Sequence, residues 1–297
     1  MFFDSYETPV FRPPSEARSF ILRVTRGCAH NHCTYCNMYR GVPFQILTDE
    51  EISRQIVMAE YYGKQKVRRI FLADGDALVL PTAKLLKILN VLKEKFPKLQ
   101  RVSSYAAPKD MLLKSVDELR QLREAGLEVL YYGMESGDDA TLKAVKKGVD
   151  GPQAIEAGRR VREAGIKLSM MIILGLAGVE GSRQHALETA KAINIIKPNY
   201  LSALCLMLYR GSELKEQFEA GLFHPLSPGG LMDELKLIME NVNIPEDTHC
   251  LFRSNHVSNY VQFAATLPKD KEQLLKEIDF ATQELYKLKK WDVYNYS

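Results

Sequence analysis

Two kinds of apolar pattern alternate along the chain. Near-continuous apolar runs cover residues 19–26, 67–73, 100–106, 127–133, 166–174 and 200–208. Between them, apolar residues recur every three to four positions over residues 50–62, 82–95, 115–125, 152–164 and 182–196. Runs of the first kind predict β-strands, and stretches of the second kind predict amphipathic helices. Ser115 and Glu118 form a capping-box pattern at the start of one helix, and Gly126 marks its end.

The regular alternation of six strands with helices predicts parallel βα units. Strands in such units are apolar throughout, because helices cover one face and the packed interior covers the other. Since strand–helix–strand crossovers are right-handed, the units curl in one direction into a barrel or part of one. Six units are too few to close the usual eight-stranded barrel. We therefore expect an α/β fold, a partial (β/α)6 TIM barrel with a helical C-terminal extension.

The last part of the chain breaks this rhythm. It carries three helical patterns, at residues 213–220, 230–241 and 270–290, with a polar and aromatic stretch between the last two. We interpret this part as a cap on an open barrel. The expected organisation is an N-terminal extension at residues 1–17, a partial barrel at 18–215 and a C-terminal cap at 216–297.

Composition and charge exclude several other classes of protein. The 297 residues are 46% hydrophobic and 26% charged, which is the ordinary balance of a globular chain. With 40 Lys and Arg against 37 Asp and Glu, the net charge of +3 offers no electrostatic footprint for a nucleic acid, and none is expected as a partner. The longest apolar run, residues 168–179, is too short to span a bilayer. Without an export or membrane signal, we expect a cytoplasmic protein that binds no membrane.

The five cysteines are distributed unevenly. Cys28, Cys33 and Cys36 lie within nine residues after the first strand, whereas Cys205 and Cys250 are far away. In α/β barrels, the loops that follow the strands carry the active site. Three thiolates in one such loop can hold an iron–sulfur cubane and leave one iron open to a small-molecule ligand.

A zinc site is the alternative interpretation of the same loop. Structural zinc takes four ligands, and only His30 or His32 offers a fourth one nearby. His32 adjoins Cys33, which strains simultaneous ligation by both. The spacing therefore favours an iron–sulfur cluster.

The cysteine loop resembles the signature of the radical S-adenosylmethionine (SAM) enzymes. The two-residue gap before Cys36 matches that signature and Tyr35 supplies its aromatic residue, but the first gap has four residues instead of three. Three further segments resemble family motifs in the family's order: residues 73–77, 133–137 and 173–178. Residues 142–148 are similar to the branch of the oxygen-independent coproporphyrinogen oxidases and tRNA methylthiotransferases. The resemblance covers residues 18–215 and implies a barrel of radical SAM type.

This resemblance implies two cofactors and the residues that hold them. Cys28, Cys33 and Cys36 would bind a [4Fe–4S] cluster. The implied SAM-contacting positions are Tyr35, Asn37, Gly75, Asp76, Ala77, Glu135, Ser136, Arg159, Gly175 and Leu176. A flavodoxin- or ferredoxin-like donor would supply the electron that cleaves SAM reductively to a 5′-deoxyadenosyl radical, which abstracts hydrogen from a substrate. Taken singly, Asp76 also fits a turn cap, Glu135 a loop salt bridge and Arg159 a solvated side chain.

We expect the substrate-binding residues in the polar stretch at residues 252–260. Arg253, His256 and Tyr260 are the candidate catalytic residues there. If the stretch is helical, His256 and Tyr260 share a face through their four-residue spacing. The alternative is that these polar groups satisfy buried hydrogen bonds. The substrate class, a small molecule or a peptide, is not named by the sequence.

Two other function classes stay open: a non-catalytic iron–sulfur or zinc-binding barrel protein, and a SAM-dependent maturase of a protein or metallocofactor. The motifs at residues 73–77 and 133–137 favour a SAM-binding protein, because a bare metal protein needs no SAM pocket. Cys205 and Cys250 are too few for a second four-cysteine cluster. Fewer than 30 residues precede Cys28, so no cobalamin-binding domain fits before the cluster.

Overall fold

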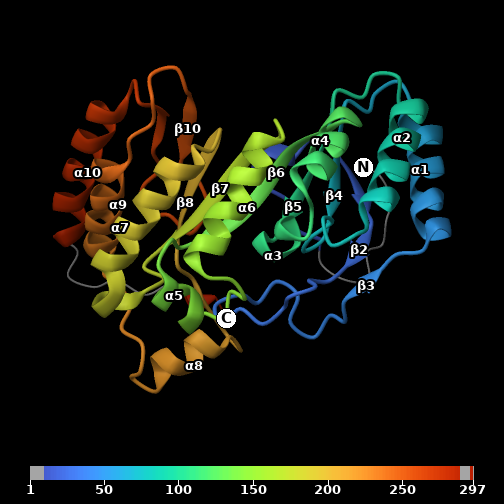
Figure 1. Ribbon diagram of the computed structural model, residues 1–297. Coiled ribbons are helices and arrows are strands. Elements are labelled where there is room, and N and C mark those ends of the chain that lie inside the picture. Colours follow the sequence, from blue (N-terminus) through green and yellow to red (C-terminus); the bar gives the residue numbers. More distant parts are fainter. Residues whose placement is uncertain (1–9, 288–294, 297) are drawn as a thin grey trace. The chain divides into compact units, whose positions relative to one another are not determined.

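The computed structural model describes residues 10–287 and 295–296 (Figure 1). These residues fall into two compact units. The first unit comprises residues 10–31, 38–132 and 160–168, and the second comprises residues 32–37, 133–159, 169–287 and 295–296. Residues 1–9 of the expected N-terminal extension, and residues 288–294 and 297 of the expected cap, lie outside the described residues. The domain boundaries at residues 18 and 215 stay a prediction.

The first unit is a parallel sheet with its helices. Its strands follow the order β1 (Phe20–Arg23), β4 (Arg69–Ala73), β5 (Arg101–Ala106) and β6 (Leu127–Glu135), of which β6 contributes its first six residues. Phe20 lies opposite Ile70, and Arg69 lies opposite Arg101. The helices are α1 (Asp49–Gly63), α2 (Thr82–Lys95), α3 (Pro108–Leu112) and α4 (Val116–Glu124). A 3-10 turn, η1 (Pro14–Glu16), and the antiparallel pair β2 (Thr25–Arg26) and β3 (Gln45–Ile46) complete it.

Local sequence explains where these elements begin and what they bury. Ser115 caps α4, and the expected capping box with Glu118 is confirmed: each side chain bonds the other residue's backbone N–H. Thr48 forms the same arrangement with Glu51 at the start of α1. Helix α2 buries a stripe of leucines, including Leu85, and it contacts α4. The apolar residues that recur along the helix thus form its buried face.

The second unit continues the same construction. Its strands follow the order β7 (Lys167–Leu174), β8 (Tyr200–Cys205), β10 (Cys250–Arg253) and β11 (Ala264–Leu267), all parallel except the β10–β11 pair. Strand β9 (Leu208–Tyr209) pairs with β12 (Asn295–Tyr296). The helices are α5 (Asp139–Ala144), α6 (Gly151–Glu163, of which the last four residues belong to the first unit), α7 (Gly178–Ile196), α8 (Glu213–Glu219), α9 (Pro228–Asn241) and α10 (Lys271–Tyr286). Helix α9 contacts both α7 and α10 (Figure 1).

The expected fold class is confirmed. The six expected strands are β1, β4, β5, β6, β7 and β8, and the chain has the expected mixed α/β, mostly parallel architecture with a helical C-terminal region. That region also contains β10, which pairs in parallel with β8. In the part of the chain that the structure describes, no helix is long and apolar enough to cross a membrane.

The conditional helical interpretation of residues 256–260 is wrong. These residues lie in the loop that joins β10 to β11. Ser254 exchanges backbone and side-chain hydrogen bonds with Phe263, which closes the loop. Asn259 donates to the carbonyl of Ala203 at 2.7 Å and accepts the Cys205 N–H at 3.0 Å. The Asn259 side chain therefore satisfies backbone groups of β8, as the alternative of buried hydrogen bonds expected.

Candidate cofactor site

The second half of the cysteine loop, residues 32–37, is anchored on both sides within the second unit. The Thr34 N–H donates to the Val145 carbonyl at 3.0 Å, and the Thr34 carbonyl accepts the Leu214 N–H at 3.0 Å. Beyond this anchor, the Asn37 side chain donates to the Arg210 carbonyl at 3.2 Å. The thiols of Cys33 and Cys36 flank Thr34 and are partly exposed. The backbone thus fixes a short turn that carries two thiols at its surface.

Glu135 forms an ion pair with Lys147 beside these thiols. The Lys147 Nζ donates to Glu135 Oε1 at 2.9 Å, and both side chains are about nine-tenths buried. Burial alone would lower the pKa of Lys147, but Glu135 and then the thiols of Cys33 and Cys36 raise it. Burial raises the pKa of Cys33, and the charge of Lys147 opposes that rise. Lys147 is therefore a cation facing two thiols, where it favours thiolates.

The backbone at Glu135 is shaped for this contact. Its φ is +67°, in the left-handed region that non-glycine residues rarely adopt. A Cβ on Gly133 would lie only 2.2 Å from Glu135 Oε1, so the carboxylate can keep this position only beside a glycine. Tyr35 lies close by: burial first, and then the Glu135 charge, raise the pKa of its phenol. The ring of Tyr35 also packs on an apolar cluster that includes Leu176.

Cys28 lies in the first unit, against the turn that follows β4. The Gly75 N–H donates to the Gly27 carbonyl at 3.0 Å, and a Cβ on Gly75 would come within 2.7 Å of both Cα and Cβ of Cys28. Arg23 binds both oxygens of the buried Asp74 carboxylate, at 2.6 and 3.0 Å. Glycine at position 75 thus lets this turn approach the Cys28 backbone closely.

Asp76 has a structural role in this turn. Its Oδ1 accepts the Leu78 N–H at 2.7 Å and its Oδ2 accepts the Ala107 N–H at 2.9 Å. Burial, with Asp110 adjoining, raises the pKa of the Asp76 carboxyl. Ala77 is also fully buried. Contacts of Asp76 and Ala77 with SAM stay a prediction, and the two side chains shape the turn whose backbone would receive a ligand.

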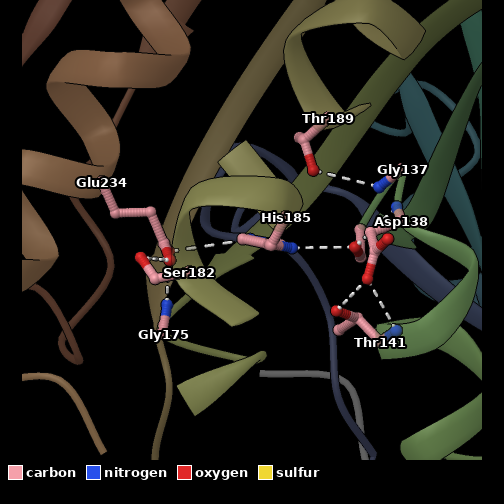
Figure 2. A network of polar contacts seen from close by, with 9 residues as sticks. Gly137, Asp138, Thr141, Gly175, Ser182, His185, Thr189 and Glu234 are labelled. Carbon is pink, nitrogen blue, oxygen red and sulfur yellow. Dashed lines mark hydrogen bonds and ion pairs between the residues drawn. The ribbon is translucent and has the colours of Figure 1, made fainter. Parts of the chain in front are cut away.

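A buried polar network holds the ends of β6 and β7 in the second unit (Figure 2). The hydroxyl of Ser136, which is fully buried, lies 2.8 Å from Nδ1 of His185 on α7. The Gly137 N–H donates to the Thr189 hydroxyl at 3.0 Å. Glu234 of α9 accepts the Gly175 N–H at 2.6 Å. Ser136 therefore acts on the loop backbone, and its direct contact with SAM stays a prediction.

The remaining positions of the expected SAM site differ in their surroundings. Gly175 adopts a φ of +79°, and Leu176 is buried in the apolar cluster that also holds Tyr35. Arg159 is half exposed on α6, where both ends of its guanidinium bond the Glu156 carboxylate. Nothing in these surroundings supports the role expected of Arg159, which stays a prediction.

The candidate catalytic residues lie at the end of β10 and in the loop after it. Arg253 is exposed, and its guanidinium donates to the Phe252 carbonyl at 2.7 Å. The Nδ1 of His256 accepts the Ser258 N–H at 3.2 Å, and burial lowers the pKa of the imidazole. Tyr260 is half-buried. Their catalytic roles stay a prediction.

Parallel βα units, with a three-cysteine loop and an acidic glycine turn after successive strands, define a class of cofactor-binding α/β-barrel protein. The sequence profile of the Radical SAM superfamily matches residues 22–190, more than half of the chain. The chain belongs to the radical SAM superfamily, whose members are enzymes that bind a [4Fe–4S] cluster and SAM.

Two curated relatives illustrate the range of the similarity. The uncharacterised protein MJ0486 of Methanocaldococcus jannaschii is 25% identical over 210 residues, which is 67% of this chain and 64% of that protein. The heme chaperone HemW of Bacillus subtilis is 22% identical over 173 residues, 56% of this chain and 45% of that protein. The chain thus spans less than two thirds of the length of the curated relatives it matches.

Solved structures share the fold. Methylornithine synthase (PylB) superposes with a TM-score of 0.52 at 14% identity, covering 88% of this chain and 81% of that one. The radical SAM methyltransferase TsrM from Kitasatospora setae superposes with a TM-score of 0.51 at 15% identity, covering 63% of this chain and 36% of that one. At such low identity the likeness concerns the fold alone.

Three residues of the site region were missed by sequence reasoning. Lys147, His185 and Glu234 form the contacts described above. Glu234 had a detectable signal, because it falls on the apolar stripe of its helix with Leu231 and Leu235. Lys147 lies within residues 142–148, whose resemblance to the family gave it no role, and His185 had no local signal because Ser136 lies 49 positions away.

Proposed function

We propose that this protein is a radical SAM enzyme that cleaves SAM reductively and uses the 5′-deoxyadenosyl radical to abstract hydrogen from a substrate. The observation that carries the proposal is the Glu135–Lys147 pair beside Cys33 and Cys36, in a chain that belongs to the superfamily. It places charged side chains from the segment at residues 133–137 and from residues 142–148 beside the second half of the cysteine loop.

In this proposal, Cys28, Cys33 and Cys36 hold the [4Fe–4S] cluster. The chemistry of the donor set fits it, because three partly exposed cysteines lie within nine residues of one loop. When bound, the cluster supplies the electron that breaks the C5′–S bond of SAM. The charge of Lys147 opposes the rise that burial imposes on the pKa of Cys33.

SAM binding is assigned to the turns that follow β4, β6 and β7. Glu135 offers a carboxylate, paired with Lys147, to the hydroxyl or ammonium groups of SAM. Gly75 and Gly175 let these turns pack closely against Cys28 and Leu231, respectively. Tyr35, Asn37 and Leu176 are further proposed SAM contacts. The electron donor is a flavodoxin- or ferredoxin-like protein.

Arg253, His256 and Tyr260 are proposed to contact the substrate. Backbone donation to Nδ1 of His256 leaves the proton of the neutral ring on Nε2, which makes that atom a hydrogen-bond donor. Arg253 supplies an exposed cation for an anionic substrate group. The substrate is a small molecule or a peptide.

The test is anaerobic reconstitution with iron and sulfide, followed by incubation with SAM and dithionite. We expect about four irons per chain and release of 5′-deoxyadenosine. Cys36→Ser abolishes both, whereas Cys205→Ser, a buried cysteine outside the loop, is the matched control and retains both. Zinc binding without SAM cleavage would contradict the proposal.

A second candidate function follows from the similarity to a heme chaperone. A SAM-binding maturase acting on a metallocofactor would bind heme with or without SAM cleavage. Titration with hemin separates the two: a stoichiometric Soret shift supports the maturase, and its absence together with 5′-deoxyadenosine release supports the enzyme.

A further inference from the structure

Two buried titratable side chains join helices α7 and α9 but have no role in the proposed chemistry. His185 has no exposed surface, and Glu234 is 2% exposed. Burying such groups is costly unless hydrogen bonds compensate. Figure 2 shows that their contacts reach the two loops that follow β6 and β7. The partners of these side chains therefore indicate what the pair holds in place.

Glu234 binds the turn after β7. Its Oε1 accepts the Gly175 N–H at 2.6 Å and its Oε2 accepts the Ser182 hydroxyl at 2.5 Å. Nε2 of His185 lies 3.6 Å from Oε1 and has no hydrogen-bond partner within the described part of the chain. A carboxylate opposite this nitrogen favours the tautomer that carries its proton on Nε2.

His185 binds the loop after β6. Burial lowers the pKa of His185 to about 4, so the ring is neutral. With the proton on Nε2, Nδ1 accepts a hydrogen bond from the Ser136 hydroxyl, 2.8 Å away. The same Ser136 oxygen accepts the Asp138 N–H at 3.0 Å. The Ser136 hydroxyl is thus fixed by one bond in each direction.

These bonds act on the residue next to Ser136. Glu135 keeps a left-handed backbone, which persists in a non-glycine residue only when its surroundings enforce it. The three residues that follow Glu135 supply that enforcement: Ser136 bonds His185, Gly137 bonds Thr189, and the Asp138 N–H bonds back to Ser136. Helix α7 carries both outside partners.

We propose that His185 and Glu234 are positioning residues for SAM binding. Through Ser136, His185 holds Glu135 in its left-handed conformation, and Glu234 holds the Gly175 turn together with the imidazole. Helix α9, from the C-terminal region, is then a working part of the cofactor site. This inference rests on the proposed function, in which Glu135 and the Gly175 turn contact SAM.

The test compares two substitutions of the same histidine. In His185→Asn, the shorter amide takes the place of Nδ1 and keeps the bond to Ser136. In His185→Gln, the longer amide takes the place of Nε2 and loses that bond. Equilibrium binding of SAM to the reconstituted protein is expected to weaken about tenfold in His185→Gln and less than about twofold in His185→Asn; tenfold corresponds to about 1.4 kcal/mol.

Further variants separate positioning from folding. In the Ser136→Ala background, His185→Gln adds no further loss of SAM affinity, because the bond it removes is already absent. The low-temperature electron paramagnetic resonance signal of the reduced cluster stays that of wild type without SAM. His224 is the matched control: it faces Glu180 at 2.6 Å in an exposed pair, and His224→Gln leaves SAM affinity unchanged.

Each outcome decides between the two proposals. A merely structural role predicts that His185→Asn and His185→Gln weaken SAM binding equally, and that result would overturn the positioning role. Unchanged SAM affinity in both variants would overturn it as well. Glu234→Gln gives an independent reading, with SAM affinity expected to fall about tenfold and the melting temperature reporting on folding. A wild-type protein that binds a cluster but not SAM overturns the proposed function instead.

Discussion

Two glycines allow close contacts in the candidate site, one with the carboxylate of Glu135 and one with the backbone of Cys28. Gly133 leaves room for the Glu135 carboxylate, and Gly75 leaves room for Cys28. The sequence predicted both glycine segments as family motifs, but it could not supply these distances. These distances depend on the left-handed backbone at Glu135 and on the hydrogen bond between Gly75 and Gly27. Neither feature can be predicted from the periodicity of apolar residues.

Gly133→Ala tests the first of these close approaches. The new Cβ would lie 2.2 Å from Glu135 Oε1 and 3.3 Å from Lys147 Nζ, so the ion pair must move. We expect SAM affinity to fall about tenfold or more, since charged hydrogen bonds contribute about 1.5–3 kcal/mol. Gly230→Ala, whose Cβ meets nothing closer than 3.3 Å, is the control. Equal SAM affinity in both variants would count against the role of Glu135.

Gly75→Ala tests the second close approach. A methyl group 2.7 Å from Cα and Cβ of Cys28 must displace the cysteine backbone. Iron content after reconstitution is expected to fall well below about four per chain. Gly126→Ala, where the Cβ meets open space, costs stability through its positive φ but leaves the iron content unchanged. Full iron in Gly75→Ala would contradict the assignment of Cys28.

At the scale of elements, the pattern predicted helices well wherever the sequence itself carries their ends. Helix α2 begins at Thr82 and ends at Lys95, as expected. The prediction started α7 at Ser182, whereas the helix begins at Gly178, because Val179 donates to the distant His224 carbonyl and extends the first turn. Strand β10 was missed because a four-residue strand depends on pairing with β8, which the local sequence does not encode.

Two buried groups between α7 and α9, Glu234 and His185, change the free energy of unfolding with pH in opposite directions. Burial raises the pKa of Glu234 from 4.5 to about 7, so its contribution to the free energy of unfolding falls as pH rises between these values. Burial lowers the pKa of His185 from 6.5 to about 4, so its contribution rises with pH between these values. In the wild type the two slopes largely cancel between pH 4.5 and 6.5.

Single substitutions should separate the two slopes. Relative to wild type, the stability of Glu234→Gln is expected to rise from pH 4.5 to about 7, and that of His185→Asn to fall from pH 4 to 6.5. Each change amounts to at most about 3 kcal/mol. Urea unfolding followed by circular dichroism measures both. Parallel difference curves for the two variants would refute the assigned titrations.

At the scale of the whole molecule, the alternation of strands and helices was enough to predict the fold class, because parallel strands require covering helices. The superfamily followed from the cysteine loop with three further segments. The loop between β10 and β11 was beyond the sequence, because its polar side chains bond backbone groups of β8 that lie more than 50 positions away.

The central claim is that this barrel cleaves SAM. The most direct measurement is the amount of 5′-deoxyadenosine released, by liquid chromatography and mass spectrometry, from reconstituted protein incubated anaerobically with SAM and dithionite. We expect product that accumulates in proportion to protein and is absent from Cys33→Ser. A protein with a full complement of iron that leaves SAM intact would contradict this account.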